Sequence, residues 1–172
     1  KWIYPLAQNP RGRDAYQAGQ WNQFRIEAIG PEIRVWVNGI QTANLVDDMT
    51  ASGFIALQVH SIRDEELAGR EIHWRKIRIK TSGLAEERWP VSPYAPEVNL
   101  IPNTLTEYEK RTGWRLLWDG KTTNGWRSAR GPAFPEKGWE IKEGTLSVLA
   151  SGGAESANGG DIITQQKFSN FE

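Results

Sequence analysis

Two pairs of polar residues have the spacing that puts both members on one face of a strand. Gln58 and His60 lie two apart in FIALQVH (54–60), and Arg25 and Glu27 lie two apart in FRIEA. Alternate residues of a strand point to the same side of the sheet. Histidine is the usual general acid or base near neutral pH, so His60 is the candidate catalytic base, with Gln58 and Arg25 as polarising contacts. A metal-ligand role for His60 is also open, and a structural, hydrogen-bonded His60 is an equally open interpretation.

Arg25, Glu27 and Trp36 have a second possible role as ligand contacts. Arg25 and Glu27 fit a charged pair on a solvated face, and the sequence favours that over hydroxyl binding or acid–base work. Trp36 alternates away from the apolar face of 33–37, so it is either a stacking platform for a ring-shaped ligand or a lid on a second core. Both interpretations of each residue stay open at this point.

Several kinds of reactive site are excluded by composition and spacing. The chain has two histidines and no cysteine, which rules out thiol chemistry and leaves too few residues for a histidine-based metal cluster or a Ser-His-Asp triad. Asp47 and Asp48 are adjacent, so on an extended chain they point apart and make a poor carboxylate pair. His73 reads as a surface residue. The sequence predicts no metal ligands and no cofactor, and it leaves a divalent metal open.

The overall composition limits the kinds of partner that the chain can have. The chain has 172 residues and a formal net charge of zero, so it has no basic footprint for nucleic acid. No apolar run approaches the roughly 20 residues that span a bilayer. Nine tryptophans are unusual for this length, and tryptophan stacks on sugar rings as readily as it fills cores.

Period-2 alternation and turn residues predict an all-β chain. Asn38-Gly39 between two alternating runs predicts a β-hairpin, because both residues accept the positive φ of a type I′ turn. The alternation changes phase near Arg75–Lys76, as a β-bulge would cause. Thr104 with Glu107 fits a capping box for the one predicted helix, 104–111, with Gly113 after its end. The predicted strands are 21–28, 33–37, 54–60, 71–80, 114–118, 138–142, 145–149, 162–164 and 168–172.

These elements predict an antiparallel sandwich that a proline-rich stretch divides. Pro90, Pro93, Pro96 and Pro102 fall in 81–103, where no periodic pattern exists, so that stretch reads as an extended linker.

The ordered motifs of the two ends resemble the 3-keto-disaccharide hydrolase domain, which has the concanavalin A-like lectin/glucanase jelly-roll fold. WNQFRIEAIGPEIRVWVNG (21–39), DDMTASGFIALQVHS (47–61) and IHWRKIRIK (72–80) resemble its C-terminal half. Three later motifs resemble the N-terminal half of the same domain: GWRLLWDGKTTNGWR (113–127), KGWEIKEGTLSV (137–148) and GGDIITQQKFSNFE (159–172).

The two halves stand in reverse order along the chain. This predicts the C-terminal half of one sandwich (1–80), a linker with the short helix (81–113) and the N-terminal part of a second sandwich (114–172). A permuted single domain is the alternative. Six tryptophans then fall where the family places strand and turn residues, which predicts that most of them are core (Trp21, Trp74, Trp114, Trp118, Trp126 and Trp139). Open strand edges predict poor stability, or self-association with further copies or further parts of a longer chain.

The resemblance implies a function. It implies cleavage of glycosidic bonds in sugars that carry a ketone at C3, with carbohydrate as the partner and a periplasmic or extracellular location. A non-catalytic carbohydrate-binding module on the same fold is the alternative, because a fold does not determine an activity.

Overall fold

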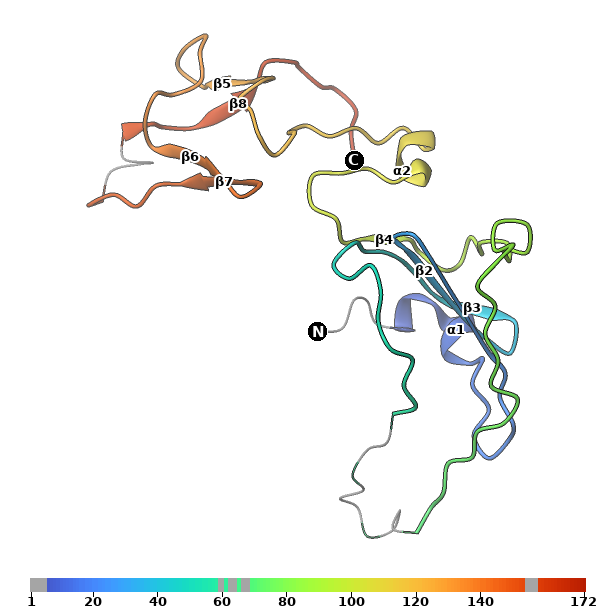
Figure 1. Ribbon diagram of the computed structural model, residues 1–172. Coiled ribbons are helices and arrows are strands. Elements are labelled where there is room, and N and C mark those ends of the chain that lie inside the picture. Colours follow the sequence, from blue (N-terminus) through green and yellow to red (C-terminus); the bar gives the residue numbers. More distant parts are fainter. Residues whose placement is uncertain (1–5, 59–60, 62–64, 66–68, 154–157) are drawn as a thin grey trace. The chain divides into compact units, whose positions relative to one another are not determined.

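The computed structural model describes residues 6–58, 61, 65, 69–153 and 158–172 (Figure 1). The chain divides into two compact units, Lys1–Val98 and Asn99–Glu172. Each unit is described by itself below. The predicted division at 81–113 into two partial sandwiches stays a prediction.

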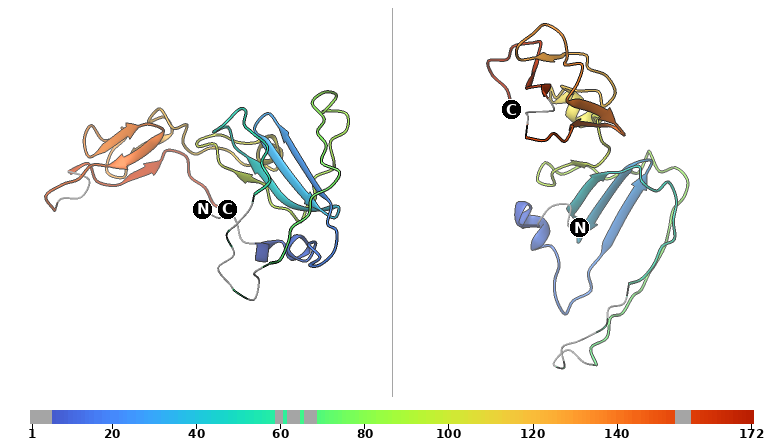
Figure 2. Two further views of the ribbon diagram at one scale, coloured as in Figure 1. Left: turned by 60° about the horizontal axis from the view of Figure 1, so that its bottom comes forward. Right: turned by 90° about the vertical axis from the view of Figure 1, so that its left-hand side faces the viewer.

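The first unit is built on an antiparallel sheet in the order β1-β2-β3-β4. Asn38 and Gly39 connect β2 to β3 and have φ of +49° and +81°, as a tight turn requires. The predicted hairpin is therefore confirmed. Figure 2 shows the three long strands side by side. The strands are β1 (Phe24–Ile29), β2 (Glu32–Val37), β3 (Ile40–Val46) and the two-residue β4 (Val98–Asn99).

A bulge interrupts the pairing of β2 with β3. Val35 lies opposite Ala43, but Trp36 lies opposite Gln41, so Thr42 is an extra residue on β3. The Thr42 hydroxyl donates a hydrogen bond to the Val35 carbonyl at 3.3 Å. The bulge turns Gln41 to the same face as Trp36.

Two short helical turns precede the sheet, where the sequence predicted only loops. η1 spans Leu6–Gln8 and α1 spans Pro10–Arg13. Asn9 caps α1 by accepting a hydrogen bond from the Gly12 amide at 2.9 Å, and Pro10 suits the first helical position, where no amide is needed. Gly12 must lack a side chain, because a Cβ there would lie 2.5 Å from the Asn9 amide nitrogen.

The two predicted strands at 54–60 and 71–80 are wrong within the described residues. Residues 54–58 and 71–80 have no strand structure, and they run as extended chain away from the sheet in Figure 1. Phe54, Ile72 and Ile79 are largely exposed. An alternating sequence makes a strand only where a neighbour completes its hydrogen bonds and covers its apolar face. Lys76 has φ of +55°, so the backbone is irregular at the predicted bulge even though no ladder forms there.

The second unit holds two small antiparallel ladders. β5 (Trp126–Ser128) pairs with β8 (Ile162–Thr164), and β6 (Trp139–Lys142) pairs with β7 (Thr145–Val148). Glu143-Gly144 forms the predicted turn between β6 and β7, with φ of +51° and +72°. The predicted strands at 114–118 and 168–172 are wrong, and β5 was missed because WRS offers too short a pattern.

The single predicted helix is confirmed with a corrected start. α2 spans Glu107–Arg111, and Thr106, not Thr104, is its N-cap. Thr106 and Glu109 form the capping box: the Glu109 amide donates to the Thr106 hydroxyl at 3.1 Å, and the Thr106 amide donates to Glu109 Oε2 at 2.7 Å. Gly113 follows the helix with φ of +95°, as expected.

The fold class is all-β and antiparallel, consistent with the predicted sandwich, with only short helices. Tryptophans play two roles in it. Trp118, Trp126 and Trp139 donate indole hydrogen bonds to backbone carbonyls at 2.8–2.9 Å. Three others are about half-exposed, so the prediction that they are core is wrong for Trp21, Trp74 and Trp114. No helix among the described residues is long and apolar enough to cross a membrane.

The β1–β3 sheet buries its polar face and exposes much of its apolar face. Phe24 and Ile26 on β1 are 51% and 67% exposed. Glu27, which follows Ile26 and points to the other face, is buried. This distribution is the reverse of an ordinary half-buried sheet. The buried polar face is therefore where a site is sought.

Candidate functional site

The polar face of the sheet is a continuous cluster across three strands. The register places Arg25 opposite Trp36 and Glu27 opposite Arg34, and the bulge brings Gln41 opposite Trp36. Trp36 is 3% exposed, Gln41 2% and Glu27 6%. Buried polar groups cost free energy unless they are hydrogen-bonded, so these side chains need partners from elsewhere in the chain.

Residues 87–95, named the connector from here on, supply many of those partners. The Trp89 ring meets the Trp36 ring edge to face, with centroids 5.6 Å apart and an interplanar angle of 72°. The backbone amide of Ser92 donates to Gln41 Oε1 at 2.7 Å, and Ala95 is buried. The proline-rich stretch thus packs on the sheet here, although it has no periodic pattern of its own.

Arg25 and Glu27 form an ion pair beneath the connector. Glu27 Oε1 accepts hydrogen bonds from Arg25 Nε at 2.9 Å and from the Trp89 backbone amide at 3.0 Å. Arg25 also donates to the Glu87 carbonyl at 2.8 Å, and its guanidinium carbon lies 4.6 Å from the centroid of the Trp89 ring. Glu27 Oε2 is buried and has no hydrogen-bond partner among the described residues. The pair therefore keeps one buried acceptor free.

A second ion cluster extends this face toward the start of β2. Glu32 accepts from Arg34 at 2.7 Å through one oxygen and pairs with Arg88 of the connector through the other. The Nε atoms of both arginines are buried without partners among the described residues. Two guanidiniums and one carboxylate leave this end of the face with an excess of positive charge.

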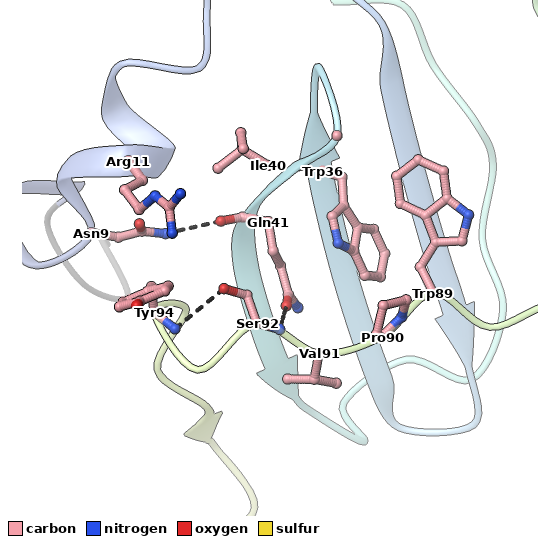
Figure 3. A pocket seen from close by; sticks show the side chains of 11 residues that line it. Asn9, Arg11, Trp36, Ile40, Gln41, Trp89, Pro90, Val91, Ser92 and Tyr94 are labelled. Atoms are coloured by element: carbon pink, nitrogen blue, oxygen red, sulfur yellow. Dashed lines mark hydrogen bonds between the residues drawn. The ribbon is translucent and has the colours of Figure 1, made fainter.

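A pocket of about 250 Å³ borders the polar face. The sheet contributes Trp36 and Gln41 to it, and the connector contributes Trp89 and Tyr94. In Figure 3, Arg11 and Tyr94 lie on one side of Gln41, and the two tryptophans lie on the other. Its walls combine aromatic surface with amide groups, which is the usual character of a small-molecule site.

Comparison with known proteins identifies the family of the chain. The profile of the 3-keto-alpha-glucoside-1,2-lyase-like domain matches residues 2–80 and 113–172, which is most of the chain. The chain belongs to this lyase-like family. It is also 44% identical over 62 residues to a 3-keto-disaccharide hydrolase of Bacteroides thetaiotaomicron. That match covers 35% of the chain and 21% of the relative, so the chain matches about a fifth of the relative's length.

The structure of this family member brings together three of the five residues that the sequence singled out. Arg25, Glu27 and Trp36 share the buried polar face, so the interpretation of Arg25 and Glu27 as a solvated pair is wrong for Glu27. Gln58 is exposed, lies outside any strand, and makes no hydrogen bond to a described residue. His60 lies outside the described residues. The catalytic and binding roles of all five stay predictions.

Several residues of the lyase-like domain's polar face were missed by sequence reasoning. Trp89 was assigned to a linker, although an isolated tryptophan between Arg88 and a proline is a signal that the segment packs on something. Gln41 was missed because the bulge hides its face from a period-2 pattern. Asn9, which is 1% exposed and donates to the Gln41 carbonyl at 2.9 Å, gave no pattern at all.

Among the described residues of the second unit, Asp119 is the carboxyl group whose pKa is most strongly shifted. Its oxygens accept hydrogen bonds from the Thr122 hydroxyl at 2.5 Å and from the amides of Lys121 and Thr122 at 2.8 and 2.7 Å. These bonds stabilise the carboxylate and lower the pKa of Asp119 to about 2, chiefly through the Thr122 hydroxyl. All donors are local, so the Asp119 carboxylate closes a turn. The described residues hold no group of three metal-ligating side chains.

Proposed function

We propose that this protein takes part in cleaving glycosidic bonds of sugars that carry a ketone at C3. Family membership supports the substrate class, and the name of the Bacteroides thetaiotaomicron relative agrees with it. The structural observation that carries the proposal is the Arg25–Glu27 pair beside Trp36, in which one buried carboxylate oxygen of Glu27 has no partner among the described residues.

The chemistry follows from the ketone. A C3 ketone acidifies the C–H bond at C2, so a base can remove that proton. The electron pair of the C–H bond then forms a C1=C2 double bond, the C1–O bond breaks, and the aglycone oxygen takes up a proton. Water adds across the double bond afterwards, which gives net hydrolysis. Such a reaction needs one base and a cation near the developing oxyanion, and it does not need two carboxylic acids.

Residue roles follow from this scheme. His60 is the proposed base, because histidine is the usual general base near neutral pH and the chain has only two histidines. Arg25 is the proposed cation for the oxyanion, and Gln58 a second polarising contact. Glu27 is proposed to accept a sugar hydroxyl through Oε2, and Trp36 to contact the sugar ring. Arg25 and Glu27 lie under Trp89, whose ring contacts the Arg25 guanidinium and whose backbone amide donates to Glu27.

A chromogenic substrate tests the proposal. The purified protein is incubated with p-nitrophenyl 3-keto-α-glucoside, and p-nitrophenol release is followed, with the unoxidised glucoside as the substrate control. We expect release from the ketone only, complete loss in His60→Ala, and at least a 100-fold fall in kcat in Arg25→Gln. Arg78→Gln, an exposed arginine outside the polar face, is the matched control. Wild-type rates in His60→Ala would remove His60 as the base, and binding without release would indicate a carbohydrate-binding module.

A further inference from the structure

Arg11 presents a free positive charge at the pocket that borders the polar face. Its side chain is exposed, and it has no hydrogen bond or ion pair to any described residue. Among the described residues, its guanidinium lies over the Tyr94 ring, 4.9 Å from the guanidinium carbon to the ring centroid. Arg13, two residues along, is paired with Asp14 at 2.7 Å instead. Arg11 is therefore the arginine of α1 that is available to a ligand.

The pocket offers no negative charge to compensate Arg11. Its described lining contains no aspartate or glutamate, so its net charge is positive. A guanidinium in this setting binds a carboxylate through two parallel hydrogen bonds, which gives geometric selectivity as well as attraction. The ligand that fits this charge carries a carboxylate.

The remaining surface suits a single sugar ring. Trp89 and Tyr94 supply aromatic faces at the two sides, as Figure 3 shows. The side-chain amides of Asn9 and Gln41 donate to the carbonyls of Gln41 and Ala43, and both side chains line the pocket between the aromatic residues. A volume of about 250 Å³ is below that of drug-sized sites, and matches one ring with its hydroxyls.

The pocket is preformed by buried hydrogen bonds. Gln41 holds the connector through the Ser92 amide at 2.7 Å and holds the N-terminal segment through its own carbonyl and Asn9 at 2.9 Å. Both amide side chains are almost fully buried, and Gly12 leaves the space that Asn9 needs. A site whose walls are already fixed loses less conformational entropy on binding.

We propose that this pocket binds a hexuronic acid residue, with Arg11 pairing with the sugar carboxylate and Tyr94 contacting the ring. The proposal adds a binding subsite for an acidic sugar to the proposed function. It rests on the proposed function in one respect, which is that the ligand is a sugar. No bond breaks in this pocket, because its described lining has no carboxylate or histidine to act as a base. Binding is measured without catalysis, so it can fail or succeed independently of glycoside cleavage.

Calorimetric titration of the purified protein tests this. The probes are sodium galacturonate and sodium glucuronate, with galactose, glucose and sodium acetate as controls for ring and charge. We expect at least one uronate to bind at least tenfold more tightly than its neutral counterpart and than acetate. Arg11→Gln should weaken uronate binding at least tenfold and leave neutral-sugar binding unchanged, and Arg11→Lys should restore part of the loss.

Arg13→Gln is the matched control, because it removes the same charge from the same helix away from the pocket. Unchanged melting curves for both variants would show that the fold persists. Equal affinity for uronates and neutral sugars would overturn the proposal, as would uronate binding that Arg13→Gln weakens as much as Arg11→Gln. If acetate bound as tightly as the uronates, Arg11 would be a simple anion contact, and the proposal of a sugar site would be overturned.

Discussion

The Trp89 ring meets the Trp36 ring edge to face, at 5.6 Å between centroids, and so joins the connector to the middle strand of the sheet. The same indole of Trp89 lies against the Arg25 guanidinium, and its backbone amide donates to Glu27. One residue of the connector thus contacts the aromatic, cationic and anionic members of the polar face. The stability of the face and access to it depend on the same side chain.

Replacing Trp89 with alanine should destabilise the first unit by about 2 kcal/mol. An edge-to-face aromatic pair contributes about 0.5–1.5 kcal/mol and a partly exposed cation–π contact about 0.5–1 kcal/mol. Urea unfolding followed by far-UV circular dichroism measures the change. Trp114→Ala, which removes a half-exposed tryptophan that stacks on no described ring or cation, is the control in the second unit and should cost less than about 0.5 kcal/mol. Equal effects of the two substitutions would contradict the role assigned to Trp89.

Replacing Glu27 with glutamine should cost more than replacing an exposed glutamate. The change removes the charge that faces Arg25, whose side chain is 35% exposed, and it keeps the shape of the side chain. Loss of a charge-assisted hydrogen bond costs about 1.5–3 kcal/mol when buried, and solvent around Arg25 reduces this to about 1–2 kcal/mol. Chemical denaturation compares Glu27→Gln with Glu140→Gln, an exposed glutamate on β6. A difference below about 0.5 kcal/mol would show that the pair is energetically neutral.

The exposed apolar face should cause the protein to self-associate at high concentration. Phe24 and Ile26 lie exposed on β1, and Trp74 and Ile77 are exposed on the extended segment 71–80. Exposed apolar side chains of this kind promote association. Size-exclusion chromatography with light scattering should show a concentration-dependent mass, which Ile26→Lys reduces. Gln23→Lys adds the same charge to a polar exposed position and should not reduce it. A concentration-independent monomer with a sharp thermal transition would contradict the expectation.

The Asp119 turn should resist acid more than an ordinary carboxyl group does. Its pKa is lowered from 3.8 to about 2 in the folded protein, so its carboxylate stabilises the fold above pH 3.8, and that contribution is lost as the pH falls through 2. Carbon-detected NMR of the side-chain carboxyl group should give a midpoint near pH 2. Thr122→Val removes the largest cause and should raise the midpoint toward 3.8. A midpoint that the substitution leaves unchanged would mean that the backbone amides alone hold the carboxylate.

Local signals predicted the parts of the fold that depend on neighbours in sequence. Asn38-Gly39, Glu143-Gly144 and Gly113 all adopt the positive φ expected of them, and the β6–β7 hairpin follows from its alternation. Long-range contacts decided the rest. Residues 54–58 have a strand-like sequence pattern, but they pair with no strand among the described residues and so do not form a strand themselves.

The candidate site was predicted only where it lies on one strand. Arg25 and Glu27 could be placed on one face because their spacing is even and their strand is regular. The partners that bury them come from the connector, and nothing local in ERWP shows which side chains it will meet. The pocket depends on three separate segments, so only the fold brings Arg11, Gln41 and Tyr94 together.

The extra residue on β3 changes how positions on this face must be counted. Gln41 and Asn44 are both buried on the same face of β3 although they are three residues apart, because the bulge inserts Thr42 as one extra residue between them. An alignment that scores strands by strict alternation would assign Gln41 to the opposite side. A variant library aimed at the polar face would then randomise Ile40 and Thr42 and leave the amide that holds the connector untouched.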